Sequence, residues 1–292
     1  MDERSALRSL AATFPAAGDD AAVIDGLAVT TDMLHERSDF PRGTTRYTAG
    51  WRAVGASLSD LAAMGAAATC SVAVYAAPSF EEGEINAFVR GARDVCRRVD
   101  GEYVGGDLDE HAEFTAATTA IGRVEDPVYR HGASPGEAVC VTGELGRTAA
   151  ALRRFESGDT DVGNELFRFP PRIAAGRALR AHASAMMDSS DGLARSLHQL
   201  GEASDCGFAI EWDRLPVHPA AEAVAVDETD RRECAAHVGE DFELVFTTPD
   251  PDAALAAAEA TGVSATVIGE VTEHGVTANG EPLPDRGFTH GE

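Results

Sequence analysis

The sequence is divided near its middle by a polar segment, residues 123–137, that carries two prolines and two glycines. Such a segment does not extend a helix or a central strand and is typical of a domain boundary. We therefore predict an N-terminal domain of residues 1–125 and a C-terminal domain of residues 126–292. Strand-like and helix-like segments alternate with hairpins in each half. The expected fold class is α/β of the mixed α+β kind, with two domains and no doubly wound parallel sheet.

The spacing of hydrophobic residues predicts the helices and strands of the chain. The clearest helix covers 80–99, and another covers 48–64, with Trp51, Leu58 and Leu61 on its apolar stripe and Asp60 off it. Further helices are expected to end near Phe155 and to cover 172–182, 193–202, 220–234 and 252–260. Residues 158–164 are expected to form a loop. Strands are expected at 71–75, 103–104, 114–124, 138–141, 185–187, 207–212, 242–247 and 264–271.

The stretch 18–32 holds an acidic pair after a glycine, an apolar run, an Asp25-Gly26 turn and a second run that ends in Thr-Thr-Asp. This pattern predicts a β-hairpin whose ends bring hydroxyl and carboxylate oxygens together. Oxygen ligands on rigid strands suit a hard cation such as Mg²⁺. The simpler interpretation is a polar hairpin edge, and the stretch alone does not decide between the two.

The charge of the chain limits its partners. All 24 basic residues are arginine, 49 residues are acidic, and the net charge is −25. Such a charge repels nucleic acids and anionic membranes, so neither is an expected partner. An acid-rich, lysine-free composition indicates an acidic surface adapted to high salt, and most acids are interpreted as solvating groups.

Cysteine usage and the N-terminus favour a cytoplasmic protein. The five cysteines are widely spaced and form no Cys-x-x-Cys motif, so a disulfide framework and a zinc site are not expected. The first residues show no signal-peptide pattern, and the uncharged stretch 61–80 is interrupted by Gly65 and Pro78. No secretion signal or membrane span is therefore predicted.

Several common catalytic motifs are absent from the sequence. A P-loop and a protein-kinase site both require a lysine, which this chain lacks. The chain contains no His-Glu-x-x-His and no Gly-x-Ser-x-Gly, so a zinc peptidase and an α/β-hydrolase are not supported.

The remaining candidates are carboxylates at strand ends, beside glycines or on a helix: Asp20, Asp32, Asp60, Asp107, Asp188 and Asp191. Each alone is more simply a cap, a turn residue or part of the acidic surface. Their shared setting indicates convergence on a cation, because several carboxylates without a metal would repel one another. Two or more metal ions shared with phosphate oxygens would relieve that repulsion.

These acids fall within a series of motifs that resembles the thiamine-monophosphate kinase family, in the aminoimidazole ribonucleotide synthetase-like superfamily. The motifs are Gly-Asp-Asp at 18–20, Thr-Thr-Asp at 30–32, Leu-Ser-Asp-Leu-Ala-Ala-Met-Gly at 58–65, Gly-Gly-Asp at 105–107, Arg-His-Gly-Ala at 130–133, Pro-Gly-Glu at 135–137, Val-Thr-Gly at 141–143, Asp-Ser-Ser-Asp-Gly-Leu at 188–193 and Gly-Glu-Asp-Phe-Glu-Leu at 239–244. The resemblance implies a two-domain subunit that forms a homodimer through its N-terminal mixed sheet. It also implies direct transfer of the ATP γ-phosphoryl group to the phosphate of thiamine monophosphate.

The resemblance assigns roles to individual residues. Magnesium ligands would be Asp20, Thr30, Thr31, Asp32, Asp60, Asp107, Asp188 and Asp191, with Asp32, Asp60 and Arg130 in the catalytic role. ATP would be contacted by Gly106, Asp107, Arg130 and Ser190, and thiamine monophosphate by Asp39, Glu240 and Phe288. The acceptor phosphate is already a nucleophile, so catalysis would consist of positioning and charge neutralisation, with Arg130 as a bidentate clamp.

The chain departs from the family pattern at a few positions. Asp39 stands where the family usually has histidine near the acceptor phosphate, and an acid there requires a metal ion or an arginine such as Arg37 or Arg42. Leu108 follows Gly-Gly-Asp in place of threonine, and Ser57 precedes Leu-Ser-Asp in place of asparagine.

Two alternatives stay open at this point. The chain could be another ATP-using enzyme of the superfamily, acting on a purine precursor or in selenophosphate-type chemistry, although members that need a catalytic lysine or a cysteine tail fit poorly. It could instead be a catalytically silent nucleotide-binding dimer, against which the nearly complete acidic set argues.

Overall fold

The structure, a computed structural model, describes residues 10, 13–14 and 18–287. Its N-terminal half contains β1 (Ala22–Ile24), β2 (Leu27–His35), α2 (Glu36–Asp39), α3 (Arg46–Ala63), β3 (Ala67–Ala77), α4 (Glu82–Arg97), β4 (Glu102–Glu110) and β5 (Thr115–Arg123). These strands form a five-stranded sheet in the order β1-β2-β5-β3-β4, in which β3 and β4 are parallel and the other pairs antiparallel.

The C-terminal half builds a second sheet. It contains β6 (Ala138–Thr142), α5 (Arg147–Glu156), α6 (Thr160–Phe167), α7 (Ile173–Leu179), β7 (Ala185–Asp188), α8 (Leu193–Ser204), β8 (Gly207–Ile210), α9 (Pro219–Val224), α10 (Glu228–Ala236), β9 (Leu244–Thr248), α11 (Pro251–Glu259), β10 (Ala265–Thr272), β11 (Val276–Ala278) and β12 (Glu281–Pro282), with a 3₁₀ turn at Trp212–Arg214. The seven strands follow the order β12-β11-β8-β10-β6-β9-β7, and β11 and β8 are the parallel pair. Both sheets are mixed, so the predicted fold class is confirmed.

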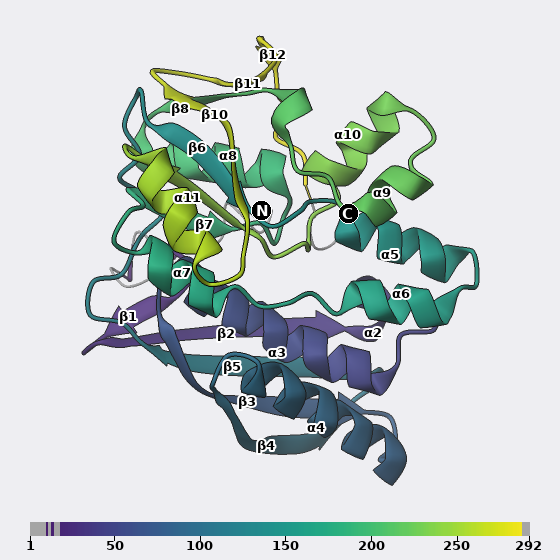
Figure 1. Ribbon diagram of the computed structural model, residues 1–292. Coiled ribbons are helices and arrows are strands. Elements are labelled where there is room, and N and C mark those ends of the chain that lie inside the picture. Colours follow the sequence, from purple (N-terminus) through teal and green to yellow (C-terminus); the bar gives the residue numbers. More distant parts are fainter. Residues whose placement is uncertain (1–9, 11–12, 15–17, 288–292) are drawn as a thin grey trace.

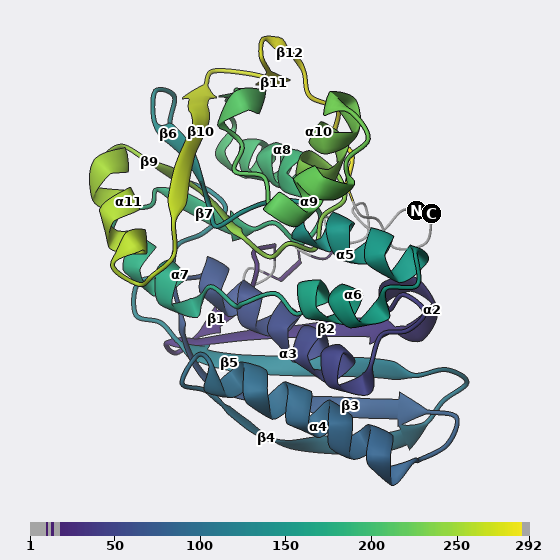
Figure 2. The same cartoon turned by 45° about the vertical axis from the view of Figure 1, so that its right-hand side comes forward.

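Helix α3 lies between the first sheet and the C-terminal half, as Figures 1 and 2 show. Fifteen of its residues are buried, because β2 and β5 cover one side while α4, α6 and α7 cover others. Glycines allow the close contact with α4: a Cβ on Gly50 would lie 2.1 Å from the Phe88 carbonyl oxygen, and one on Gly91 would lie 2.0 Å from that of Tyr47. The helix that carries Asp60 is therefore held rigidly at the junction of the two halves.

The opposite face of the first sheet is open. Along β5, residues 116, 118 and 120 are buried beneath the helices, whereas 117, 119 and 121 are only partly covered. Large apolar side chains on the strands remain exposed, among them Met33 at 54%, Val74 at 38% and Val104 at 57%. This face of the sheet has no covering layer among the described residues.

Three sequence-based expectations about elements were wrong, and one hairpin was not expected. Residues 158–164 do not form a loop, because α6 begins at Thr160. The helix expected at 220–234 is broken into α9 and α10 by residues 225–227. Strand β4 continues through Gly105 to Glu110 instead of ending before the glycines, and the β11–β12 hairpin was not expected. No helix within residues 18–287 is both long and apolar enough to cross a membrane.

Candidate active site

Three carboxylates from distant parts of the chain meet at the junction of the two halves. Asp20 precedes β1, Asp60 lies in the last turn of α3, and Asp188 ends β7. One oxygen of each lies within 4.8 Å of the others. Asp188 Oδ2 is buried and receives no hydrogen bond from the described residues. A buried acceptor without a donor, in a set of oxygen ligands only, fits a hard divalent cation such as Mg²⁺.

The three acids repel one another, and their pKa values reflect this. Burial and, after it, the charge of Asp20 raise the pKa of Asp188 to about 7. Burial also raises the pKa of Asp60 well above its usual range, with the charges of Asp32, Asp188 and Asp20 adding to the effect. Such raised values indicate that the site is arranged for positive charge from a ligand.

Arg130 is the counter-ion on one side of this cluster. Its Nη2 lies 2.7 Å from Asp20 Oδ1 and its Nε 3.3 Å from Asp20 Oδ2, while its backbone N–H donates to Asp19 Oδ2 at 3.0 Å. Asp19 was not singled out from the sequence. Burial raises its pKa to about 6, and the charge of Asp20 acts in the same direction. The acidic pair 19–20 is therefore fixed by one arginine from the segment that joins the two sheets.

Strand β2 adds two side chains on the helix-covered face of the first sheet. Thr30 Oγ1 donates to Asp60 Oδ2 at 2.6 Å, and Asp32 Oδ2 accepts from Ser57 Oγ at 2.6 Å. Ser57 Oγ also lies 2.7 Å from Thr118 Oγ1 on β5. The serine at position 57 thus orients Asp32 toward α3.

Thr31 and Asp107 lie on the open face of the same sheet. Two neighbouring cross-strand rows run Asp32–Thr118–Ala73–Gly106 and Met33–Ala117–Val74–Asp107. Neighbouring rows point to opposite faces, so Asp107 points away from the face that carries Asp32. The strands β5 and β3 also separate it from β2, a spacing of about 14 Å. Thr31 turns its hydroxyl to the Thr118 carbonyl oxygen, at 2.8 Å. Within one chain, neither residue joins the three carboxylates.

The loop after β7 carries Ser190 and Asp191, and it packs against the turn 239–243. Glu240 N–H donates to the Ser190 carbonyl oxygen at 2.6 Å, and Ser189 N–H donates to the Glu243 carbonyl oxygen at 2.8 Å. Asp191 Oδ2 accepts from Gln199 Nε2 at 3.4 Å. The turn is unusual because Glu240 and Phe242 both have positive φ, 56° and 55°. Residues held in this region cost free energy and cluster at functional sites.

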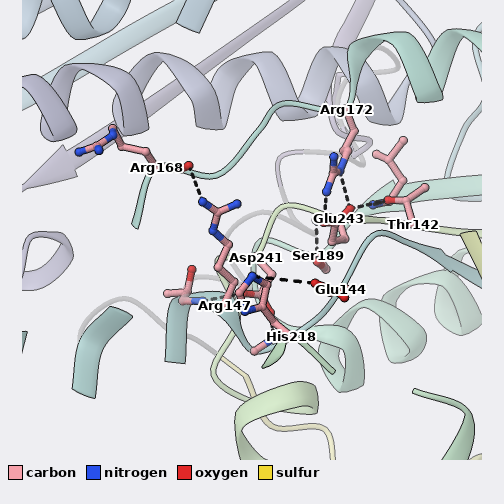
Figure 3. A network of polar contacts seen from close by, with 12 residues as sticks. Thr142, Glu144, Arg147, Arg168, Arg172, Ser189, His218, Asp241 and Glu243 are labelled. Carbon is pink, nitrogen blue, oxygen red and sulfur yellow. Dashed lines mark hydrogen bonds and ion pairs between the residues drawn. The ribbon is translucent and has the colours of Figure 1, made fainter. Parts of the chain in front are cut away.

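The side chains of this turn are held by a network of polar contacts, most of which Figure 3 displays. Glu243 forms a two-fold ion pair with Arg172 and accepts from Thr142 Oγ1 at 2.7 Å. Asp241 accepts from the backbone N–H groups of Gly146 and Thr148, at 2.5 and 2.8 Å, at the start of α5. Burial raises the Asp241 pKa to about 7.

The predicted acceptor residues Asp39 and Glu240 line one pocket of about 240 Å³ between the two halves. Arg37, Arg42 and Thr148 line it as well. Asp39 accepts from His35 N–H at 2.6 Å and from Ser38 Oγ at 2.9 Å. The two arginines provide positive charge in the same pocket as Asp39. Phe288 lies outside the described residues.

Sequence reasoning missed Arg52, whose side chain is 1% exposed. It reaches from α3 to the turn 239–243, with Nη2 2.8 Å from Glu240 Oε2. The apolar residues within 48–64 predict one buried face of a helix, and nothing in that pattern indicates that the arginine at position 52 is buried as well. The acid that it meets lies 188 positions away.

Comparison with known proteins places these features in context. Residues 18–124 match the model of the AIR synthase related protein N-terminal domain, and residues 134–279 that of the C-terminal domain. The chain is 57% identical to a thiamine-monophosphate kinase of Halobacterium salinarum, covering 99% of this chain and 100% of the relative. It is 38% identical to one of Methanospirillum hungatei, covering 93% and 92%.

Solved structures show the same likeness. Thiamine-monophosphate kinase from Stenotrophomonas maltophilia superposes with a TM-score of 0.82 at 32% identity, covering 90% of each chain. A structure described as AaThiL complexed with AMPPCP and TMP superposes with a TM-score of 0.89 at 26% identity, covering 99% of this chain and 97% of that one.

Proposed function

The chain belongs to the thiamine-monophosphate kinase family of AIR synthase related proteins, and we propose how its residues carry out the reaction. It is an enzyme that phosphorylates thiamine monophosphate with ATP. In the proposed reaction an oxygen of the acceptor phosphate attacks the γ-phosphorus of ATP. A new P–O bond forms while the bond to the β–γ bridging oxygen breaks, giving thiamine diphosphate and ADP.

The convergence of Asp20, Asp60 and Asp188 is the observation that carries this proposal. We propose that these acids hold magnesium ions together with Thr30, Asp32 and Asp191. Bound Mg²⁺ would neutralise phosphate oxygens that otherwise repel each other. Because the acids come from both halves of the chain, the cluster lies where a nucleotide and an acceptor could meet.

The protein residues then supply binding and orientation. Arg130, which is fixed by Asp19 and Asp20, is proposed to donate to the transferring phosphoryl group. Ser190 is proposed to contact ATP, because the neighbouring Asp188 holds its loop beside the cluster. Asp39, Glu240 and Phe288 are proposed to bind the acceptor, with Arg37 and Arg42 facing its phosphate. No group need remove a proton, since the acceptor phosphate is ionised at neutral pH.

We propose a homodimer in which the open face of the first sheet is covered by a second copy. Exposed Met33, Val74 and Val104 on that face support this, since a patch of this kind is typical of an interface. Asp107 lies on the same face, and Gly106 directly precedes it on β4, so we propose that their contacts with ATP and metal serve the site of the partner copy. The five free cysteines agree with a reducing compartment such as the cytoplasm.

A direct assay tests the proposed function. The purified protein in high salt, given ATP, Mg²⁺ and thiamine monophosphate, should form thiamine diphosphate and ADP in equal amounts. Thiamine in place of its monophosphate is the control acceptor and should give no diphosphate. Nucleotide binding without product, under conditions in which the protein is folded, would contradict the proposal.

A further inference from the structure

Arg52 is a fully buried cation on α3, the helix that carries Asp60, and its side chain reaches Glu240 at the acceptor pocket. Its guanidinium donates to the Phe167 carbonyl oxygen at 2.8 Å, to the Glu240 carboxylate at 2.8 Å and to the Glu240 carbonyl oxygen at 3.2 Å. It also stacks on the Phe167 ring, 3.6 Å from the ring centroid, with Phe169 and Phe242 nearby. A planar guanidinium with fixed donors is suited to holding a carboxylate in one orientation.

The backbone of Glu240 is held by other groups in addition to Arg52. Its N–H donates to the Ser190 carbonyl oxygen at 2.6 Å, and its carbonyl oxygen accepts from Thr148 Oγ1 at 2.7 Å. The carboxylate is different, because Oε2 is bound to Arg52 while Oε1 receives no hydrogen bond from the described residues. Arg52 therefore fixes the direction of the side chain, whereas the backbone contacts with Ser190 and Thr148 also hold the main chain of Glu240.

Two carboxylates near Arg52 line the acceptor pocket and suit the cationic ring of the acceptor. Glu240 lines the acceptor pocket and its side chain is 14% exposed, so its carboxylate reaches both the arginine and the pocket. Asp39, which lines the same pocket, also acts on Arg52 through its charge. A thiazolium ring is positive, and a carboxylate oxygen held in a partly buried pocket attracts it more strongly than one in water.

We propose that Arg52 is a positioning residue that binds one oxygen of Glu240 so that the other faces the acceptor pocket and recognises the cationic ring of the acceptor. This inference rests on the proposed function. It assigns to Arg52 a part in acceptor specificity in addition to its packing between the two halves.

The test is steady-state kinetics of Arg52→Lys with each substrate varied in turn. Lysine keeps the charge but cannot hold the Phe167 carbonyl and the carboxylate together. We expect the KM for thiamine monophosphate to rise about 10-fold or more, while the KM for ATP and kcat change less than about threefold. Thiamine itself should also bind about 10-fold more weakly to the variant, measured by calorimetry.

Arg153→Lys is the matched control. Arg153 likewise binds a carboxylate, Asp230, through two nitrogens, and it donates to the Val224 carbonyl oxygen at 2.7 Å. Its replacement should lower stability without changing either KM. If Arg52→Lys behaves in the same way, Arg52 is only structural and the inference is wrong.

Two further outcomes distinguish a failure of the proposed function from a failure of this inference. A wild-type protein that makes no thiamine diphosphate would contradict the proposed function itself. Should Arg52→Lys not fold, Phe167→Leu removes the ring on which the Arg52 guanidinium stacks and changes no residue that lines the acceptor pocket. That variant must also raise the KM for the acceptor selectively, and unchanged values would overturn the inference.

Discussion

Replacing Asp188 by asparagine should stabilise the metal-free protein at neutral pH while it abolishes turnover. The Asp188 side chain is buried, and its Oδ2 atom accepts no hydrogen bond from the described residues. Without a cation, the folded protein must therefore keep this carboxylate protonated or tolerate a buried charge beside Asp20. An asparagine side chain has nearly the same shape and carries no charge.

The size of the effect follows from the pKa of Asp188, which burial and the Asp20 charge raise from 3.8 to about 7. Because the folded pKa lies above the unfolded one, the folded state binds the extra proton, and stability falls as pH rises from about 4 to 7. At about 1.4 kcal/mol per pH unit the full loss is roughly 4 kcal/mol. The pKa of about 7 already includes the favourable charge of Arg130, so we expect a gain of up to about 4 kcal/mol, or roughly 8 °C in Tm, at pH 8.

Thermal unfolding in a chelator measures this directly. The Tm of Asp188→Asn should exceed that of the wild type at pH 8, and the difference should shrink at pH 5. Added Mg²⁺ should raise the wild-type Tm and leave that of the variant nearly unchanged. The exposed Asp213→Asn is the control and should match the wild type throughout. A variant that is less stable than the wild type at pH 8, or a difference independent of pH, would refute the reasoning.

Four further outcomes are expected. Asp32→Asn should lower kcat about 1,000-fold or more while the protein stays folded, because Ser57 can still donate to the amide oxygen; full activity would remove Asp32 from the reaction. Glu243→Gln should lower the free energy of unfolding by about 3 kcal/mol, since it leaves Arg172 buried without its counter-charge; superimposable denaturant curves would contradict this. Val74→Asp on the open sheet face should give a monomer in analytical ultracentrifugation, whereas an unchanged dimer would place the interface elsewhere. The denaturant concentration at the midpoint of unfolding should rise steeply with KCl concentration, because screening relieves repulsion in a chain of net charge −25. A midpoint that does not change with KCl would argue against adaptation to salt.

The local sequence pattern was sufficient to predict those elements whose structure neighbouring residues determine. The hairpin at the N-terminus follows from Asp25-Gly26, whose φ values of 50° and 76° suit a tight two-residue turn. Helix α3 follows from its apolar stripe, and the prediction that Asp60 lies off that stripe agrees with its position beside Asp20 and Asp188. The order of the motifs predicted the family correctly.

The features that the sequence did not predict depend on contacts between residues far apart in the chain. Helix α6 begins in a polar stretch, and Asn164 anchors it by accepting from Thr45 N–H and donating to the Gly43 carbonyl oxygen. The burial of Arg52 depends on Glu240, far away in the sequence. Alternation along β2 could have shown that Thr31 faces away from Thr30 and Asp32, because neighbouring side chains on a strand point to opposite faces. The position of Asp107 depends on strand order, which the sequence does not reveal.

The central claim is that acids from both halves of the chain form one site for divalent cations. Isothermal titration of Mg²⁺, with a non-hydrolysable ATP analogue present at saturation, tests it most directly when wild type and Asp60→Asn are compared. We predict that the wild type binds Mg²⁺ with measurable heat beyond that of the nucleotide alone, and that Asp60→Asn loses this binding while remaining folded. Equal affinity and stoichiometry in the two proteins would contradict the claim.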